Sequence, residues 1–140
     1  MTSCLGVKKN MWNKYRAKKT ICSNGHLHAS GFEAKRCDEL HLLQRQGIIS
    51  NLQIQKKYII LESQKFKEMP SERPVAYNAD FVYNENGITV IEDTKGKATK
   101  DYIIKRKFMK KLYCADGETV FRELHESEKG RNYERRKKKN

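Results

Sequence analysis

The sequence has little that would mark an exported, membrane-spanning or disulfide-stabilised protein. No apolar run approaches the roughly 18 residues that a bilayer-spanning helix needs, and the N-terminus lacks the apolar core of a signal peptide. The four cysteines include no C-x-x-C pair, and their spacing matches no disulfide framework. These absences predict a cytoplasmic protein with reduced thiols and no membrane partner.

A structural zinc site is an alternative that the cysteines and histidines raise. Cys22, His26, His28 and Cys37 are residues of the types that bind zinc. Their spacing matches no common zinc finger. Both histidines are expected on one face of a strand, whereas Cys37 is expected on a helix. The sequence alone therefore favours the absence of a zinc site.

Acidic residues are scarce, and their distribution is uneven. The 140-residue chain has 30 lysines and arginines against 17 aspartates and glutamates, a formal charge of +13, and residues 1–32 contain no acid. The bases gather in residues 8–19, 97–111 and 129–139. Such blocks attract polyanions, because they neutralise phosphates and release counterions. Nucleic acid is the expected partner. The weaker alternatives are a merely solvated surface and an anionic membrane, which would need a helix with a large apolar face.

Hydrophobic periodicity and turn residues predict a small α/β (α+β) domain with a mixed sheet. The expected elements are a hairpin at 20–28, a helix at 30–46, strands at 48–61, 75–85 and 88–95, a helix at 101–113 and a strand at 119–124. Ser30 and Glu33 form a capping-box pattern before the first helix, and Gly47 stands where a C-terminal glycine belongs.

The second helix and the two ends of the chain complete this outline. Thr99 or Asp101 is expected to cap the second helix, in which Ile104, Phe108 and Leu112 form an apolar stripe flanked by lysines. We expect a flexible basic arm at 1–18, one folded domain at 19–124 and a basic, disordered tail at 125–140.

Asn86-Gly87, between two β-rich segments, predicts a hairpin with a two-residue type I′ turn. In that register Asp80 lies opposite Asp93, Val82 lies opposite Ile91, and Asn78 lies opposite Lys95. Because side chains alternate along a strand, these six are expected on one face. The other face is then expected to carry Tyr77, Ala79, Phe81, Tyr83, Val90, Glu92 and Thr94.

Two carboxylates on facing strands predict a bound cation. Like charges at this separation destabilise a sheet unless something neutralises them, and Mg²⁺ prefers one or two carboxylates together with waters and phosphate. Lys95 can orient a water or stabilise charge on a phosphate. Glu33, on the apolar side of its helix, supplies a third acid. The alternatives are that Lys95 and the acids only form surface ion pairs or caps, or that a register slip puts Glu92 on the acidic face instead.

The segments Y-x-A-D-F at 77–81 and I-E-D-T-K-G at 91–96 resemble the PD-(D/E)XK nuclease superfamily. The preceding G-F-E-A-K-R and L-Q-I-Q segments strengthen the similarity. The whole is similar to small phage-encoded proteins of that superfamily and, more distantly, to archaeal Holliday-junction resolvases and transposon-end endonucleases. The resemblance covers roughly residues 14–124 and implies a restriction-endonuclease-like core. One departure is Ala79, where the motif has proline.

The resemblance also implies roles for individual residues. Asp80 and Asp93 would bind a catalytic Mg²⁺ or Mn²⁺, Lys95 would be the catalytic lysine, and Glu33 would help to position the metal or a water. Gln55 takes the place of a strand glutamine near the active site in some members. Further contacts to substrate are expected from Asn78, Lys97, Lys100, Lys105 and Lys107.

The implied activity is metal-dependent hydrolysis of DNA phosphodiester bonds by an endonuclease. No zinc finger or helix-turn-helix is recognisable, which favours recognition of DNA structure over base sequence. The resemblance makes branched DNA, such as a Holliday junction in phage recombination or replication, the leading substrate. It also implies a homodimer in the cytoplasm of an infected or lysogenic bacterial host. A nonspecific DNA or RNA nuclease and a non-catalytic nucleic-acid-binding protein of the same fold remain alternatives.

Overall fold

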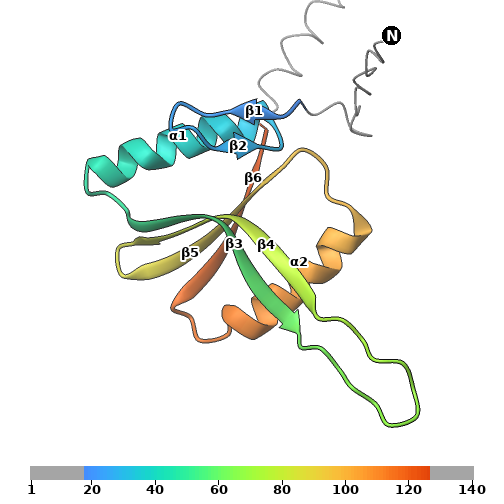
Figure 1. Cartoon of the computed structure of the whole chain (residues 1–140). Coiled ribbons are helices and arrows are strands. Elements are labelled where there is room, and N and C mark those ends of the chain that lie inside the picture. The colour runs from blue at the N-terminus through green and yellow to red at the C-terminus, as the bar shows by residue number, and fades with distance from the viewer. Residues whose placement is uncertain (1–17, 127–140) are drawn as a thin grey trace, which may run out of the picture. The chain divides into compact units, whose positions relative to one another are not determined.

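The computed structural model describes residues 18–126, and the chain groups into two compact units that divide after residue 38. The first unit holds β1 (Thr20–Ile21), β2 (Leu27–His28) and the start of α1 (Gly31–Arg45) (Figure 1). Helix α1 ends in the second unit. The predicted arm at 1–18 and tail at 125–140 lie almost wholly outside the described residues.

Residues 22–26, with a turn at 23–25, join β1 to the antiparallel β2, which confirms the predicted hairpin. Gly25 adopts φ 85°, a conformation that glycine reaches without steric cost. Its N–H donates to the carbonyl of Cys22 at 3.0 Å. Cys37 lies on α1, as predicted, and its side chain reaches the hairpin, because its Sγ lies 3.8 Å from Nδ1 of His26.

Helix α1 begins and ends with the predicted signals. The Ser30 hydroxyl accepts a hydrogen bond from the N–H of Glu33 at 3.2 Å, as a capping box requires. At the other end Gly47 has φ 74°. Its N–H donates to the carbonyl of Gln44, and the N–H that follows donates to the carbonyl of Leu43, both at 3.0 Å. This is the Schellman arrangement, which satisfies carbonyls that the last turn leaves open.

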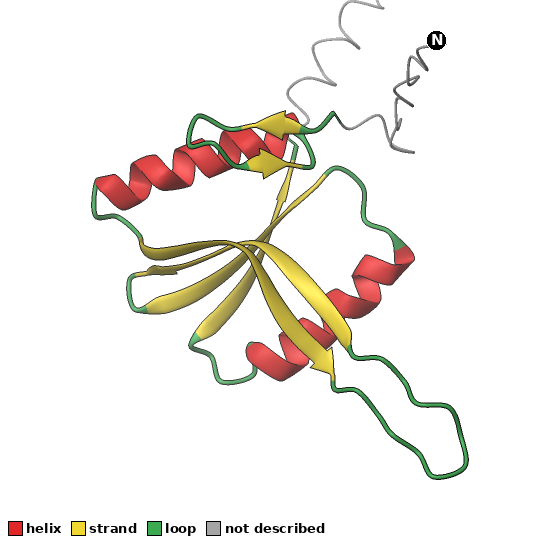
Figure 2. Cartoon of the chain, viewed as in Figure 1, coloured by secondary structure: helices red, strands yellow, loops and turns green. Residues whose placement is uncertain are grey.

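The second unit is built on a four-stranded mixed sheet (Figure 2). Its elements are β3 (Ser50–Leu61), β4 (Val75–Glu85), β5 (Ile88–Lys95), α2 (Lys100–Tyr113) and β6 (Thr119–His125). The strand order is β3-β4-β5-β6, antiparallel except for the parallel pair β5–β6, which α2 connects. The fold is therefore of the predicted α/β (α+β) class, and its mixed sheet is consistent with a restriction-endonuclease-like core.

The hairpin of β4 and β5 has the predicted turn and register. Asn86 and Gly87 adopt φ of 51° and 77°, as a type I′ turn demands at both positions. The pairs run from Glu85 with Ile88 to Phe81 with Glu92. The predicted register is thus confirmed for these five pairs, whereas the predicted pairs of Asp80 with Asp93 and of Asn78 with Lys95 are not among them.

The side chains of β4 do not alternate as predicted along the whole strand. Tyr77 and Ala79 join Val82 in one core cluster, although strict alternation would put them on opposite faces. The facing strand is irregular at the same level, because Gln55 of β3, in register with Asp80, has φ 55°. The expectation that Tyr77 and Ala79 point away from Val82 is therefore wrong, since a local irregularity interrupts the two-residue period.

Helix α2 packs on this sheet through a different face from its apolar stripe. Thr99 caps the helix, accepting a hydrogen bond from the N–H of Tyr102 at 3.2 Å. Tyr102 and Met109 are buried in the core cluster. By contrast, the stripe is about half exposed and consists of Ile104, Phe108 and Leu112. The packed face also presents Tyr113, whose hydroxyl donates to the carbonyl of Ile59 at 2.7 Å.

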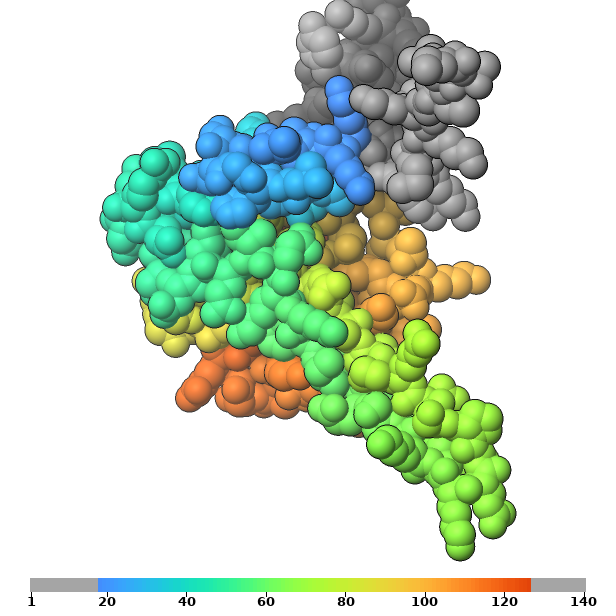
Figure 3. Space-filling view, in the orientation of Figure 1, coloured from blue at the N-terminus to red at the C-terminus, as the bar shows by residue number. Residues whose placement is uncertain are grey.

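The connection between β3 and β4, residues 62–74, extends beyond the sheet as a long arm (Figure 3). A single bridge, Gln64 with Glu72, ties its two sides together. Neither described helix is long and apolar enough to cross a bilayer.

Candidate active site

Asp93 is buried near the end of β5, with 1% of its surface exposed. Its Oδ1 accepts a hydrogen bond from the hydroxyl of Tyr77 at 2.8 Å, and its Oδ2 lies 2.8 Å from Nζ of Lys95. Burial raises the pKa of Asp93 to about 6, and the charge of Asp80 adds to the rise, whereas Lys95 and Tyr77 oppose it. At neutral pH the carboxylate is thus ionised in a place that disfavours negative charge.

Asp80 approaches Asp93 from β4, and its position is fixed by Thr94. Oδ2 of Asp80 accepts one hydrogen bond from the N–H of Thr94 and a second from its hydroxyl, both at 2.8 Å. Counted from the turn, the regular β4–β5 pairs end at Phe81, the residue next to Asp80. The carboxylate of Asp80 therefore acts as the acceptor for this backbone N–H of β5.

Lys95 completes the group from the last position of β5. Its Nζ lies 4.2 Å from the centre of the Tyr102 ring of α2, in addition to its ion pair with Asp93. A ring face attracts a cation through its quadrupole, so two different partners hold the ammonium. A quarter of the side chain remains exposed, which leaves Lys95 accessible to a molecule in solvent.

The charges of this group fit a divalent cation. Two neighbouring carboxylates and one ammonium leave an excess of one negative charge, and the charge of Asp80 adds to the rise that burial causes in the pKa of Asp93. Hard cations bind carboxylate oxygens, and Mg²⁺ commonly uses one or two of them together with waters and substrate phosphate. Asp80 and Asp93 are therefore the described residues of this site that would hold such an ion.

Glu33 belongs to the first unit, and contacts within that unit surround its carboxylate. It is buried, with Oε1 3.0 Å from Nδ1 of His28 and Oε2 accepting from the N–H of Ala29 at 3.3 Å. The carboxylate therefore bonds to Ala29, one residue before the Ser30 that a complete capping box would use. Its predicted role beside Asp80 and Asp93 stays a prediction.

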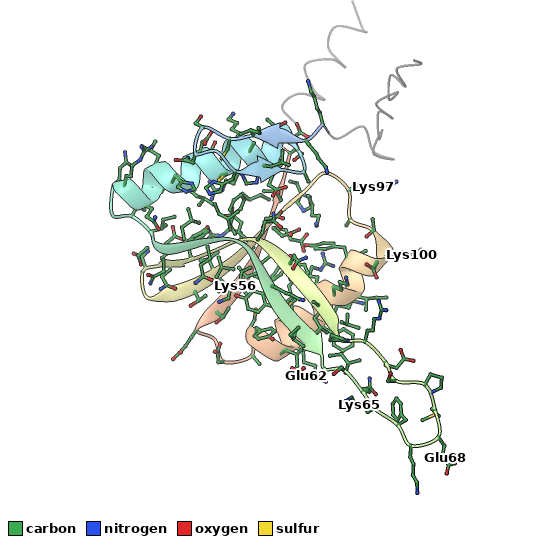
Figure 4. The ribbon with its side chains drawn as sticks, in the orientation of Figure 1. Lys56, Glu62, Lys65, Glu68, Lys97 and Lys100 are labelled. Atoms are coloured by element: carbon green, nitrogen blue, oxygen red, sulfur yellow. The ribbon has the colours of Figure 1, made fainter. Side chains whose placement is uncertain are left out.

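The predicted substrate-binding residues lie on several elements of the second unit. Gln55 on β3 and Asn78 on β4 are exposed, as are Lys97, between β5 and α2, and Lys100, the first residue of α2 (Figure 4). On α2, Lys107 is exposed, and Nζ of Lys105 lies 3.7 Å from a carboxylate oxygen of Asp101. All six except Lys105, which is half-buried, are therefore exposed to solvent.

Glu92 is bound elsewhere, which agrees with the predicted register. Its Oε1 accepts a hydrogen bond from the hydroxyl of Tyr83 at 2.8 Å, and that hydroxyl accepts another from Arg122 at 3.0 Å. Both Glu92 and Tyr83 are buried. These hydrogen bonds engage Glu92, the acid that a register slip would have placed on the face of Asp80 as an alternative metal ligand.

Sequence reasoning missed three residues that shape the site: Tyr77, Thr94 and Tyr102. Strict alternation put Tyr77 and Thr94 on the face opposite to Asp93. Tyr77 reaches Asp93 because the alternation is interrupted, and Thr94 reaches Asp80 through its backbone as well as its hydroxyl. The only sequence signal at Tyr102 was an aromatic residue in the first turn of a basic helix.

Comparisons with known proteins place the chain in a family and provide no described activity. No curated protein and no solved structure matches it. The model of the family described as "Protein of unknown function (DUF1064)" matches residues 12–133. Since that match spans most of the 140 residues, the chain belongs to this family.

Proposed function

We propose that the protein is a divalent-metal-dependent DNA endonuclease of the PD-(D/E)XK kind, with Asp80, Asp93 and Lys95 in its active site. The observation that supports this most directly is the buried Asp93 carboxylate. It lies 2.8 Å from Nζ of Lys95 and beside a second acid, whose charge adds to the rise that burial causes in its pKa. A structural ion pair alone would not require the extra negative charge of Asp80.

Each residue has a distinct part in the proposed reaction. A bound Mg²⁺ or Mn²⁺ would polarise the scissile phosphate and lower the pKa of a coordinated water. Asp80 and Asp93 supply the carboxylate oxygens that hold the ion. Lys95, a quarter exposed, donates hydrogen bonds toward the attacking water or the charge that develops on the phosphate. Tyr77 keeps Asp93 oriented through its 2.8 Å hydrogen bond.

The charge of the chain supports a nucleic-acid substrate. With a net charge of +13, the protein attracts phosphates without reading bases. Branched DNA of phage recombination or replication is the proposed substrate class, and a homodimer is proposed because symmetric cutting of two strands requires two sites. The competing proposals are a nonspecific DNA or RNA nuclease and a binding protein that cuts nothing.

The test is cleavage of a labelled panel that contains a four-way junction, a flap, a linear duplex, single-stranded DNA and RNA. Wild type is compared with Lys95→Ala in Mg²⁺, in Mn²⁺ and in EDTA. Lys110→Ala is the matched control, because Lys110 is an exposed lysine of α2 and its loss removes the same charge. Circular dichroism confirms that each variant is folded, and light scattering after gel filtration gives the oligomeric state.

Metal-dependent cutting by wild type and Lys110→Ala, with at least a 100-fold loss in Lys95→Ala, is the expected result. The preferred member of the panel then identifies the substrate class. Equal cutting of all members would favour the nonspecific nuclease. Tight, salt-dependent binding without cutting in either metal would refute the enzymatic proposal and favour the binding protein.

A further inference from the structure

A second cluster of metal-binding side chains lies in the first unit and has no part in the proposed reaction. The β1–β2 hairpin contributes Cys22, His26 and His28, and α1 contributes Cys37 (Figure 1). One ligand atom from each of the four lies within 4.8 Å of the other three. Three of the residues are buried and His26 is half-buried. The sequence spacing gave no indication of this convergence, because the turn and the helix create it.

The distances among three of these atoms fit a tetrahedral zinc ion. With Zn–S bonds of about 2.3 Å and Zn–N bonds of about 2.0–2.1 Å, tetrahedral angles separate two sulfurs by about 3.8 Å and a sulfur and a nitrogen by about 3.6 Å. The two sulfurs, of Cys22 and Cys37, are 3.7 Å apart. Nδ1 of His26 lies 3.6 Å from the first and 3.8 Å from the second. All three separations agree with a shared ion at the centre.

His28 has the outer contact that zinc-binding histidines usually have. Its Nδ1 faces Oε1 of Glu33 at 3.0 Å, so Nε2 is the ring atom available to a metal. A carboxylate on the far ring nitrogen fixes the tautomer and orientation of a metal-binding imidazole. Glu33 is itself held by the N–H of Ala29. The buried Glu33 carboxylate at the start of α1 thus holds the His28 ring in position.

The hairpin turn is also tied to the helix beside the cluster. Asp38 of α1 accepts hydrogen bonds from the N–H and hydroxyl of Ser23, at 2.9 and 3.0 Å, and from the side-chain amide of Asn24 at 3.1 Å. These bonds set the distance between the segment that contains Cys22 and the helix that contains Cys37. The ligand atoms are therefore held in place by groups that are not ligands.

We propose that Cys22, His26, His28 and Cys37 bind one structural Zn²⁺, with Glu33 orienting His28. Four protein ligands fill the tetrahedron and leave no position for water or substrate, which is the pattern of a structural site. The described part of this unit, residues 18–38, is too short to bury a substantial apolar core. Small units of this kind commonly depend on a metal for stability. The inference is independent of the proposed nuclease activity.

The experiment measures zinc in the full-length protein after purification without added chelator. Elemental analysis is expected to give one zinc per chain in wild type and in Cys114→Ser, the matched control from the second unit. Cys37→Ser is expected to lose it. Because Cys37→Ser can also fail to fold, wild type is tested without mutation. Replacement of the metal by Co²⁺ is expected to give the intense visible absorption of a tetrahedral site with two thiolates.

Thiol labelling adds a measurement that separates zinc from a disulfide. In wild type, Cys22 and Cys37 are expected to resist alkylation until a zinc-selective chelator is added in the presence of Mg²⁺, and the same chelator is expected to lower the Tm. A protein without zinc whose Tm does not respond to zinc or chelator would refute the proposal. An intact mass lower by two hydrogens, with both thiols lost, would refute it in favour of a Cys22–Cys37 disulfide.

Discussion

Asp80→Asn is expected to make the metal-free protein more stable while removing the proposed nuclease activity. The substitution replaces one of two neighbouring carboxylates with a neutral amide of nearly the same shape. The amide oxygen can still accept the two 2.8 Å hydrogen bonds from Thr94. What is lost is the negative charge that helps to raise the pKa of Asp93 to about 6.

The size of the effect follows from that pKa. A rise from 3.8 to about 6 corresponds to about 3 kcal/mol, at about 1.4 kcal/mol per pKa unit. Burial is the larger cause and Asp80 the second, so we assign about 1 kcal/mol to Asp80. Because the pKa of Asp93 is raised in the folded state, the ionised carboxylate destabilises the folded protein above pH 6. This destabilisation disappears as the pH falls from 6 toward 4 and Asp93 becomes protonated.

Urea unfolding in EDTA at pH 8 and at pH 5 measures this difference. Asp80→Asn is expected to gain about 1 kcal/mol at pH 8 and much less at pH 5. Addition of Mg²⁺ is expected to stabilise wild type more than the variant. Asp101→Asn, at an exposed carboxylate of α2, is the control and should show neither effect. A loss of stability in Asp80→Asn that is equal at both pH values would refute the electrostatic coupling of the two acids.

Four further substitutions test other contacts. Lys95→Ala leaves Asp93 without its cation, so urea unfolding at pH 8 is expected to show a free energy of unfolding lower by about 1–2 kcal/mol. This is less than for a fully buried ion pair, because Lys95 is partly exposed. An unchanged free energy of unfolding would contradict the ion pair. Tyr77→Phe removes a donor to Asp93, so carboxyl NMR titration is expected to give a higher pKa for Asp93, and an unchanged pKa would contradict the contact. Met109→Ala is expected to cost about 2–4 kcal/mol and Phe108→Ala less than about 1 kcal/mol. Equal losses would mean that α2 packs through another face.

The sequence predicted the order of the elements because local signals determine them. The type I′ turn at Asn86-Gly87 needs φ above zero at both positions, and its length fixes the register of β4 and β5. Gly47 ended α1 for a similar reason, since a left-handed residue closes the Schellman motif. Elements with such signals at their ends were predictable to within a few residues.

Contacts that depend on tertiary geometry were not predictable in this way. The two-residue period assumes a regular strand, and nothing in the residue types around Gln55 announces its φ of 55°. Tyr77 was therefore expected on the wrong face. Likewise, the stripe of Ile104 and its neighbours satisfies the helical period, yet Tyr102 and Met109 are the residues that the sheet covers. Amphipathic period alone does not choose between two partly apolar faces.

The arm between β3 and β4 offers a place to modify the protein without disturbing its chemistry. Residues 62–74 carry three acidic and three basic side chains, so the arm is electrically neutral in a chain that is otherwise strongly basic. The eight pairs between β3 and β4 hold its base, whereas only one bridge closes the arm itself. Exposed loop tips of this kind tolerate insertions. A fluorophore or affinity peptide near Glu68, at the far end of the arm (Figure 4), would report on the protein while leaving its basic segments unchanged.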